Sequence, residues 1–294
     1  MNHAVEMFEP RLAQRRRKGR IFAAACGILS VVGVGVLAVL LVSVAMEGAH
    51  LVNWQFLQRY PSTLDPLRSG VKSALWGSII LITLTSVMAV PVGVAAAIYL
   101  EEYAGDTRMT RFIRLNIANL AGVPSVVYGI LGLAVFVRGM NMGRSILAGA
   151  CIMALLSLPV IIIASREALA AVPKTFREAA FAMGATRWQT IRAHVLPAAL
   201  PGIMTGVILA ISRAIGEAAP LLMLGALTFV TFVPQSLDDA FTVLPVQIYA
   251  WSDQAQEEYR ELAAAGIIVL LGILLPMNAL AVGVRAWHNR RKVW

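Results

Sequence analysis

Residues 178–217 read EAAFAMGATRWQTIRAHVLPAALPGIMTGVILAISRAIGE and divide into two chemically different halves. The first half is polar and carries arginines, although the chain around it is apolar. The second half is apolar and long enough to be a membrane helix, yet it contains Arg213 and Glu217. A charge deep in hydrocarbon costs roughly 2.5–3.5 kcal/mol on insertion scales, so we expect both residues to face a bundle interior or an aqueous cavity.

The composition of the whole chain predicts a membrane protein. Its 294 residues are 59% hydrophobic and 14% charged, whereas soluble domains are roughly 25% charged. Runs of about 20 apolar residues recur, and each can cross a hydrocarbon layer about 30 Å thick as a helix. We therefore predict an all-α membrane protein with six transmembrane helices, at residues 21–46, 70–100, 116–137, 145–165, 198–224 and 262–284.

The positive charges indicate how this protein lies in the membrane. The basic tails at residues 1–20 and 285–294, together with the 101–115 and 166–192 loops, hold 18 of the 25 Lys and Arg residues, and the other three connections hold 5. Cytoplasmic loops carry such an excess, so both termini and the 166–197 loop are predicted to be cytoplasmic. The +9 net charge follows this pattern and does not indicate nucleic-acid binding. Residues 21–46 exceed the 7–15 apolar residues of a signal peptide and are expected to remain as an anchor.

Each of the last five predicted spans contains a proline, whereas the first contains none. A proline removes a backbone donor and bends a helix, and membrane helices tolerate this where neighbours cover the freed carbonyl. We expect a core of five kinked helices with a straight peripheral first helix. Gly202 and Gly206, at the start of the fifth span, have the spacing that permits close helix approach. The predicted kinks are at Pro91, Pro124, Pro159, Pro220 and Pro276.

The polar half of the opening stretch predicts two short helices outside the membrane. Thr175 as N-cap with Glu178 three residues later has the spacing of a capping box, and Gly184 is a natural helix end. A second short helix is expected at residues 187–195. From the residues alone two explanations stand equally: a surface presented to a cytoplasmic partner, or an interfacial helix that rests on lipid headgroups through Trp188.

The same stretch carries a family resemblance. Glu178, Ala179 and Ala180, followed by Gly184 and by Leu-Pro at 196–197, resemble the EAA loop of type I ABC importer permeases, which are MetI-like. In that family the loop forms the coupling helix that docks into a groove of the ATP-hydrolysing subunit. The resemblance therefore implies that Glu178, Ala179, Ala180 and Gly184 couple this chain to a partner ATPase.

Three further segments are similar to a narrower family, the phosphate-specific transport (Pst) permeases. They are 122–129 (GVPSVVYG), 213–222 (RAIGEAAPLL) and 244–249 (LPVQIY), and the last two favour the A-type subunit over the C-type. His194 departs from the EAA pattern, which usually has an aliphatic residue there. The resemblance covers roughly residues 70–294 and implies a bacterial inner-membrane protein in the lipid bilayer. Its expected partners are a PstC-like permease, two PstB-like ATPase subunits and an extracytoplasmic PstS-like phosphate-binding protein.

Two readings of the intramembrane pair remain open. Arg213 and Glu217 are spaced i, i+4 and share a helix face, and Pro220 would free the carbonyl of Gly216 beside them. The pair either neutralises itself and fixes helix packing, or marks a point on an anion path, because guanidinium is always charged and matches phosphate oxygens. Neutral hydroxyl donors could be added by Ser125, Tyr128, Ser157 and Ser212.

The sequence lacks the motifs of a self-sufficient pump or an enzyme. It contains no G-x-x-x-x-G-K-[ST] loop for nucleotide phosphates and no Cys/His cluster for a metal. We therefore expect no cofactor in this chain, with ATP and Mg²⁺ bound by the partner ATPase. The predicted function is half of the transmembrane path of an ATP-driven importer of inorganic phosphate. The alternatives are a permease for sulfate or molybdate, and an ATP-independent secondary transporter.

Overall fold

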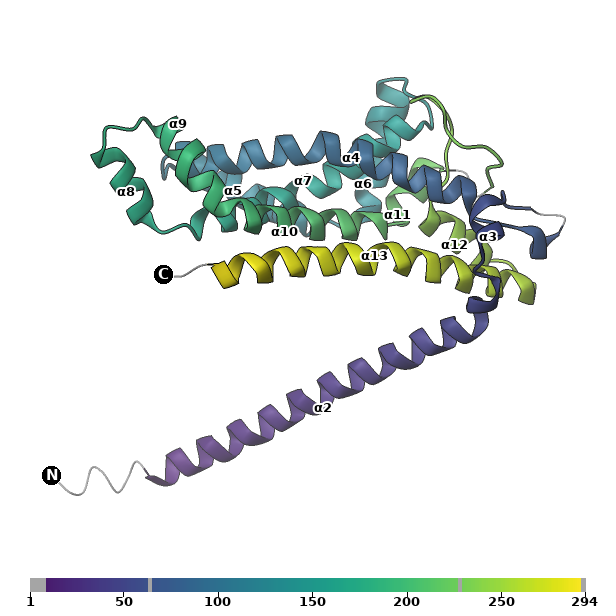
Figure 1. The fold of residues 1–294 in the computed structure, drawn as a ribbon, viewed down its shortest axis with the longest axis horizontal. Coiled ribbons are helices and arrows are strands. Elements are labelled where there is room, and N and C mark those ends of the chain that lie inside the picture. The colour runs from purple at the N-terminus through teal and green to yellow at the C-terminus, as the bar shows by residue number, and fades with distance from the viewer. Residues whose placement is uncertain (1–8, 63–64, 227–228, 292–294) are drawn as a thin grey trace.

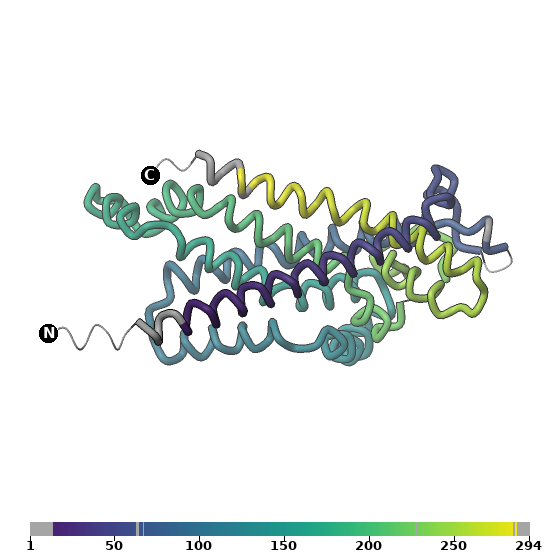
Figure 2. Tube along the Cα trace, turned by 90° about the horizontal axis from the view of Figure 1, so that it is seen from below, coloured from purple at the N-terminus to yellow at the C-terminus, as the bar shows by residue number. Residues whose placement is uncertain are grey.

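The computed structural model describes residues 9–62, 65–226 and 229–291. Over these ranges the chain forms helices and connections without a strand, which confirms the predicted all-α class. Five helices are long and apolar enough to cross a membrane, and one further helix pair qualifies as a broken span. The described chain ends and the α8–α9 segment lie at the same end of the molecule (Figures 1 and 2).

The first helix, α2 (Glu9–Gly48), stands apart from the others, as predicted. Its residues 21–46 are almost entirely exposed. It meets α13 (Glu257–Arg291) only near its own C-terminal end, where Gly48 lies against Ala264 and Ala265. Residues 9–20 of the predicted tail belong to the same helix as the predicted span at 21–46. Lys and Arg are good helix formers, so the helix continues beyond the apolar run. Residues 1–8 and 292–294 of the predicted tails lie outside the described residues.

Four long helices form the centre of the bundle (Figure 1). They are α4 (Lys72–Ile98), α7 (Ile146–Ala170), α10 (Leu196–Ile215) and α13. α4 and α10 both pack on α7, and α10 also packs on α13. Gly202 and Gly206 lie against the Cβ atoms of Ala168 and Ala164 on α7, where an added methyl group would collide. This confirms the predicted close approach, which small residues permit.

The predicted third span, 116–137, is wrong as a single helix. The chain forms α5 (Arg108–Ala121), α6 (Ser125–Gly132) and the π-helical η4 (Leu133–Gly139), with a 99° bend between α5 and the α6–η4 part. Pro124 is the N-cap of α6, so it starts a helix instead of kinking one. The Tyr128 hydroxyl donates to the carbonyl of Leu120 at 2.9 Å and so satisfies an acceptor at the end of α5. The expected loop at 101–115 is correspondingly short, because α5 starts at Arg108.

The predicted fifth span, 198–224, is also broken. α10 ends at Ile215, residues 216–218 form a turn, and α11 (Ala219–Leu224) follows with Pro220 in its first turn. A proline there loses no helical hydrogen bond, since the first N–H groups of a helix are free in any case. The predicted kink at Pro220 is therefore a chain break, whereas Pro91, Pro159 and Pro276 lie inside α4, α7 and α13.

Short elements cover the end of the bundle opposite α8 (Figure 1). They are η1 (Ala49–Leu51), α3 (Trp54–Gln58), η2 (Pro66–Arg68) and α12 (Leu244–Ser252). The connection before α12 supplies the carbonyls of Leu237 and Asp239, which accept hydrogen bonds from the N–H groups of Leu147 and Ile146 at 3.1 and 3.0 Å. The free donors at the start of α7 are satisfied in this way.

Candidate functional site

The polar half of the opening stretch forms a protrusion that we call the knob, residues 174–195. It contains α8 (Lys174–Ala182), α9 (Arg187–Thr190) and the π-helical η5 (Ile191–Val195). α8 starts after Pro173 without a side-chain cap, so the predicted capping box at Thr175 does not form. A capping box occurs instead at α9, between Thr186 and Gln189.

Gly184 makes the elbow between the two helices of the knob. Its φ of 81° lies in the left-handed region, which residues with a Cβ adopt only at a cost. The N–H of Gly184 donates to Phe181 O and that of Ala185 to Ala180 O, both at 3.0 Å. This is the Schellman arrangement that ends a helix and satisfies its last carbonyls.

The knob lies at one end of the molecule (Figure 1). Its surface is partly apolar and partly charged. Glu178 and Ala179 are exposed, whereas Ala180 is buried. Large apolar side chains beside them are also exposed, at Phe181, Met183 and Trp188. This combination of exposed apolar groups with a carboxylate suits a protein partner.

The knob is connected to the bundle by continuous helix. The expected end of the second short helix before Pro197 is wrong, because α9, η5 and α10 run without a break from Arg187 to Ile215. Pro197 sits in the first turn of α10, where it is tolerated. The knob and Arg213 therefore lie on one continuous helical segment.

Arg213 and Glu217 lie together at the end of this run. Arg213 occupies the last turn of α10, and its Nε is 3.4 Å from Oε1 of Glu217 in the following turn. A cation is favourable at a helix C-terminus, where the helix dipole is negative. The Arg213 side chain is 66% exposed on this chain, and that of Glu217 is 20% exposed. α10 ends at Ile215, well short of the ends of α4 and α13 that lie opposite α8 (Figure 1), so its C-terminus lies within the length of the bundle.

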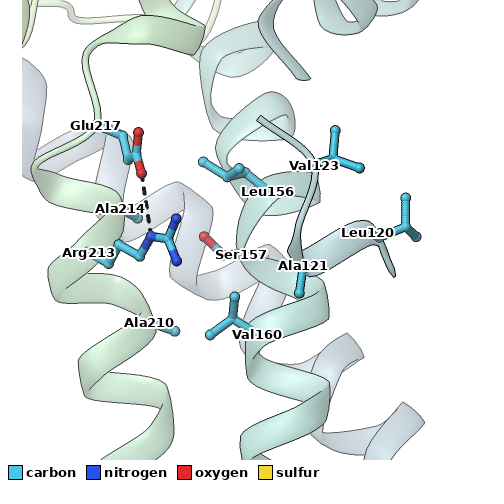
Figure 3. Close-up of a pocket in the computed structure, with 10 residues that line it drawn as sticks. All are labelled: Leu120, Ala121, Val123, Leu156, Ser157, Val160, Ala210, Arg213, Ala214 and Glu217. Atoms are coloured by element: carbon cyan, nitrogen blue, oxygen red, sulfur yellow. Dashed lines mark hydrogen bonds and ion pairs between the residues drawn. The ribbon is translucent and has the colours of Figure 1, made fainter. Parts of the chain in front are cut away.

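The pair faces a cavity between α10, α7 and the bend after α5 (Figure 3). The Arg213 guanidinium points toward α7, on which Ser157 contributes a hydroxyl. The cavity is partly open, and the space in it that water can enter is about 20 Å³, which is room for roughly one water molecule. The lining is Leu120, Ala121, Val123, Leu156, Ser157, Val160, Ala210, Arg213, Ala214 and Glu217.

Both helix breaks meet at this cavity. Val123 comes from the bend between α5 and α6, and Glu217 from the turn between α10 and α11. α6 and α11 also pack directly, since a Cβ on Gly129 would lie 2.6 Å from Pro220 O. Broken helices place backbone groups and a charge inside a bundle, and transporters use this arrangement around their substrates.

The hydroxyl groups expected near the pair are only partly brought together. Ser157 lines the cavity, whereas Ser125 and Ser212 do not. The Tyr128 hydroxyl is used by Leu120 O at the helix bend. In the described ranges no three of His, Cys, Asp and Glu come together as metal ligands.

Sequence reasoning missed a group of partly buried charges at the base of the knob. Arg177 lies beside Glu102, and Arg166 lies beside Glu101. Both glutamates belong to the π-helical turn η3 (Tyr99–Tyr103) that follows α4. The Glu-Glu pair at the C-terminal end of an apolar span is a signal that could have directed attention to this place.

Comparison with known proteins places these features in a family. Residues 89–293 match the family described as binding-protein-dependent transport system inner membrane component. The chain belongs to this family. It is therefore an integral inner-membrane transport subunit, which agrees with its membrane helices.

Two curated relatives and one solved structure illustrate the similarity. The chain is 33% identical over 208 residues to the probable ABC transporter permease protein YqgI of Bacillus subtilis (strain 168), covering 71% of this chain and 69% of that protein. It is 32% identical over 269 residues to the phosphate transport system permease protein PstA of Yersinia pestis, covering 92% and 90%. The inward-facing MetNI methionine ABC transporter shares the fold, with a TM-score of 0.56, 19% identity and coverage of 79% and 96%.

Proposed function

We propose that this chain forms half of the transmembrane path of an ATP-driven importer of inorganic phosphate. The observation that carries the proposal is the exposed guanidinium of Arg213 at the meeting point of two broken helices. The similarity to phosphate transport permeases over most of the chain supports phosphate as the substrate.

The exposure of Arg213 favours a path at the boundary of the chain. A charge at this depth is costly against lipid, so the exposed side is expected to face a second permease chain or water. The chain's own cavity, with about 20 Å³, is too small for a phosphate ion. A homologous, PstC-like permease would supply the other wall.

The chemistry of the pair suits an ion that must bind and then leave. Guanidinium offers a planar set of donors matched to phosphate oxygens and keeps its charge at any physiological pH. Glu217 holds only one edge of it, at 3.4 Å, and competes with an incoming anion. Weak, reversible binding is what permeation requires.

The energy source in this proposal is a separate pair of PstB-like ATPase subunits, which bind ATP and Mg²⁺. They would dock on the knob through the segment of Glu178, Ala179, Ala180 and Gly184. The continuous helix from α9 to α10 then passes their movement to Arg213. This arrangement puts both chain ends and the knob in the cytoplasm and leaves the opposite end for a PstS-like phosphate-binding protein.

Uptake by cells that lack only this chain tests the substrate. Radiolabelled phosphate uptake should be lost and should return with the wild-type chain but not with Arg213→Gln. Sulfate and molybdate uptake are measured in parallel. If one of these is lost while phosphate uptake is retained, the substrate assignment is wrong, although the permease role stands.

A further inference from the structure

Arg177, next to Glu178 in α8, joins three segments of the chain through one guanidinium group. Its Nε lies 3.2 Å from each carboxylate oxygen of Glu102, and its Nη2 donates to the same carboxylate. Nη1 donates to Val172 O at 2.9 Å, and Nη2 donates to Leu169 O at 3.0 Å. The side chain thus connects α8 with η3 at the end of α4 and with the end of α7.

This network is withdrawn from water. The side chains of Arg177 and Glu102 are 18% and 8% exposed. Hydrogen bonds gain strength in such surroundings, and a two-pronged arginine–carboxylate pair also fixes orientation. The carbonyls of Leu169 and Val172 lie at the C-terminus of α7, where helix carbonyls lack intrahelical partners and a cation is favourable. Removing the guanidinium would take a charged donor from the Glu102 carboxylate and from Val172 O, whereas Leu169 O would keep its bond from the N–H of Val172 at 3.2 Å.

Other contacts attach α8 to the bundle less directionally. Ala180 is the buried residue of this helix, and Phe176 packs, half-buried, against an apolar cluster that includes Leu169 and Val195. Apolar contacts have no preferred direction and allow sliding, whereas hydrogen bonds weaken steeply when their angle changes. Beside the peptide chain of residues 171–173, which joins α7 to α8, Arg177 thus adds a directional link from α8 to α7 and to η3.

A second ion pair nearby provides a comparison within the same turn. Arg166 Nη2 lies 3.3 Å from Oε2 of Glu101, and each side chain is 23% exposed. This pair joins α7 to η3, as the Arg177 pair does, but it does not involve α8. The Arg166–Glu101 pair can stabilise the bundle without transmitting movement of the knob.

We propose that Arg177 is the positioning residue that makes α4 and α7 follow movements of α8. The inference rests on the proposed docking of the knob to an ATPase. The knob is then linked to the bundle on two sides. α9 continues into α10 with Arg213, and Arg177 reinforces the chain at 171–173 in tying α8 to α7, which carries Ser157 on the other wall of the cavity. Both walls of the cavity are thereby connected to one docking surface.

The test measures phosphate taken up per ATP hydrolysed by the complete transporter in proteoliposomes. Arg177→Gln should lower this ratio about tenfold or more, since it removes several hydrogen bonds of a charged group. The ATPase subunits should still co-purify and hydrolyse ATP. Glu102→Gln keeps the bonds to the α7 carbonyls and should give a smaller loss, and it serves as the second variant if Arg177→Gln does not assemble.

Arg166→Gln is the matched control, with an expected ratio close to that of the wild type. An unchanged ratio in both Arg177→Gln and Glu102→Gln overturns the inference, as does an equal loss in Arg166→Gln. A separate experiment distinguishes a failure of the proposed docking from a failure of the role of Arg177. It tests for a crosslink from Met183→Cys to the ATPase, with Cys26 and Cys151 replaced by serine. Without a crosslink the proposed docking and this inference both fail. With a crosslink but no Arg177 effect, only the role of Arg177 fails.

Discussion

Two arginine–glutamate pairs of this chain are held in opposite ways. Arg177 is 18% exposed and donates to a carboxylate and two carbonyls. Arg213 is 66% exposed and has one carboxylate contact, at 3.4 Å. The first guanidinium uses nearly all of its donors within the chain, whereas the second keeps most of them available.

The difference separates a structural joint from a binding group. A buried, fully bonded ion pair is costly to break because the remaining charge loses its partner. An exposed pair contributes about 0–1 kcal/mol and is readily rearranged. The same residue types can thus transmit movement at the knob and accept a passing anion within the bundle.

The largest effect is expected from Arg213→Gln. If the free donors of Arg213 bind phosphate in transit, losing hydrogen bonds to a charged group costs about 1.5–3 kcal/mol, or roughly 10- to 150-fold in the uptake rate. Arg138→Gln, which removes another exposed arginine, at the end of η4, is the control and should keep wild-type uptake. Equal uptake by both variants would assign Arg213 to packing alone.

A smaller effect is expected at the elbow of the knob. Gly184→Ala places a Cβ at a φ of 81°, which costs about 1–2 kcal/mol and lowers the population of the native elbow about 5- to 30-fold. No atom lies within 4 Å of this Cβ, so the effect is purely conformational.

The measurement is ATP-driven uptake at equal amounts of protein. Gly105→Ala, whose Cβ has similar space and whose glycine lacks a positive φ, is the matched control. If the two alanine variants behave alike, the elbow conformation does not matter for coupling.

Glu217→Gln should alter affinity more than assembly. Removing a competing carboxylate at an exposed ion pair changes binding by at most about 1 kcal/mol, or roughly fivefold. We expect a lower half-saturating phosphate concentration, measured from initial uptake rates. A higher one would mean that Glu217 chiefly orients Arg213.

Tyr128→Phe should have the smallest effect. It removes the 2.9 Å hydrogen bond to Leu120 O, which keeps a bond from the N–H of Val123 at 3.1 Å, and the loss costs about 0.5–1.5 kcal/mol. The thermal stability of the purified complex should fall by a few degrees while the dependence of uptake on Arg213 persists. A complete loss of uptake would place this hydroxyl in the path itself.

The sequence predicts the membrane class and the knob better than it predicts the course of the spans. Long apolar runs suffice for the former, and Gly184 marks the helix end by its local chemistry. Pro124 and Pro220 resemble Pro91 and Pro159 in sequence, yet only the first two lie at chain breaks. The distinction depends on tertiary contacts such as the packing of Gly129 against Pro220.

The two arginine–glutamate pairs also differ in how well the sequence predicts them. Arg213 and Glu217 are four residues apart, so local spacing identifies them. Arg177 meets Glu102 across 75 residues and also bonds to backbone carbonyls, and residue types alone do not reveal either contact. Spacing along the sequence therefore identifies the Arg213–Glu217 pair but not the Arg177–Glu102 pair.

In the proposed mechanism a separate ATPase, acting through the knob, moves phosphate past Arg213. Uptake of radiolabelled phosphate by proteoliposomes that contain the complete complex tests it most directly, with ATP supplied or omitted on the side of the knob. We expect uptake that requires ATP and that falls at least about tenfold in Arg213→Gln. Equal uptake without ATP, or by the variant, would contradict it.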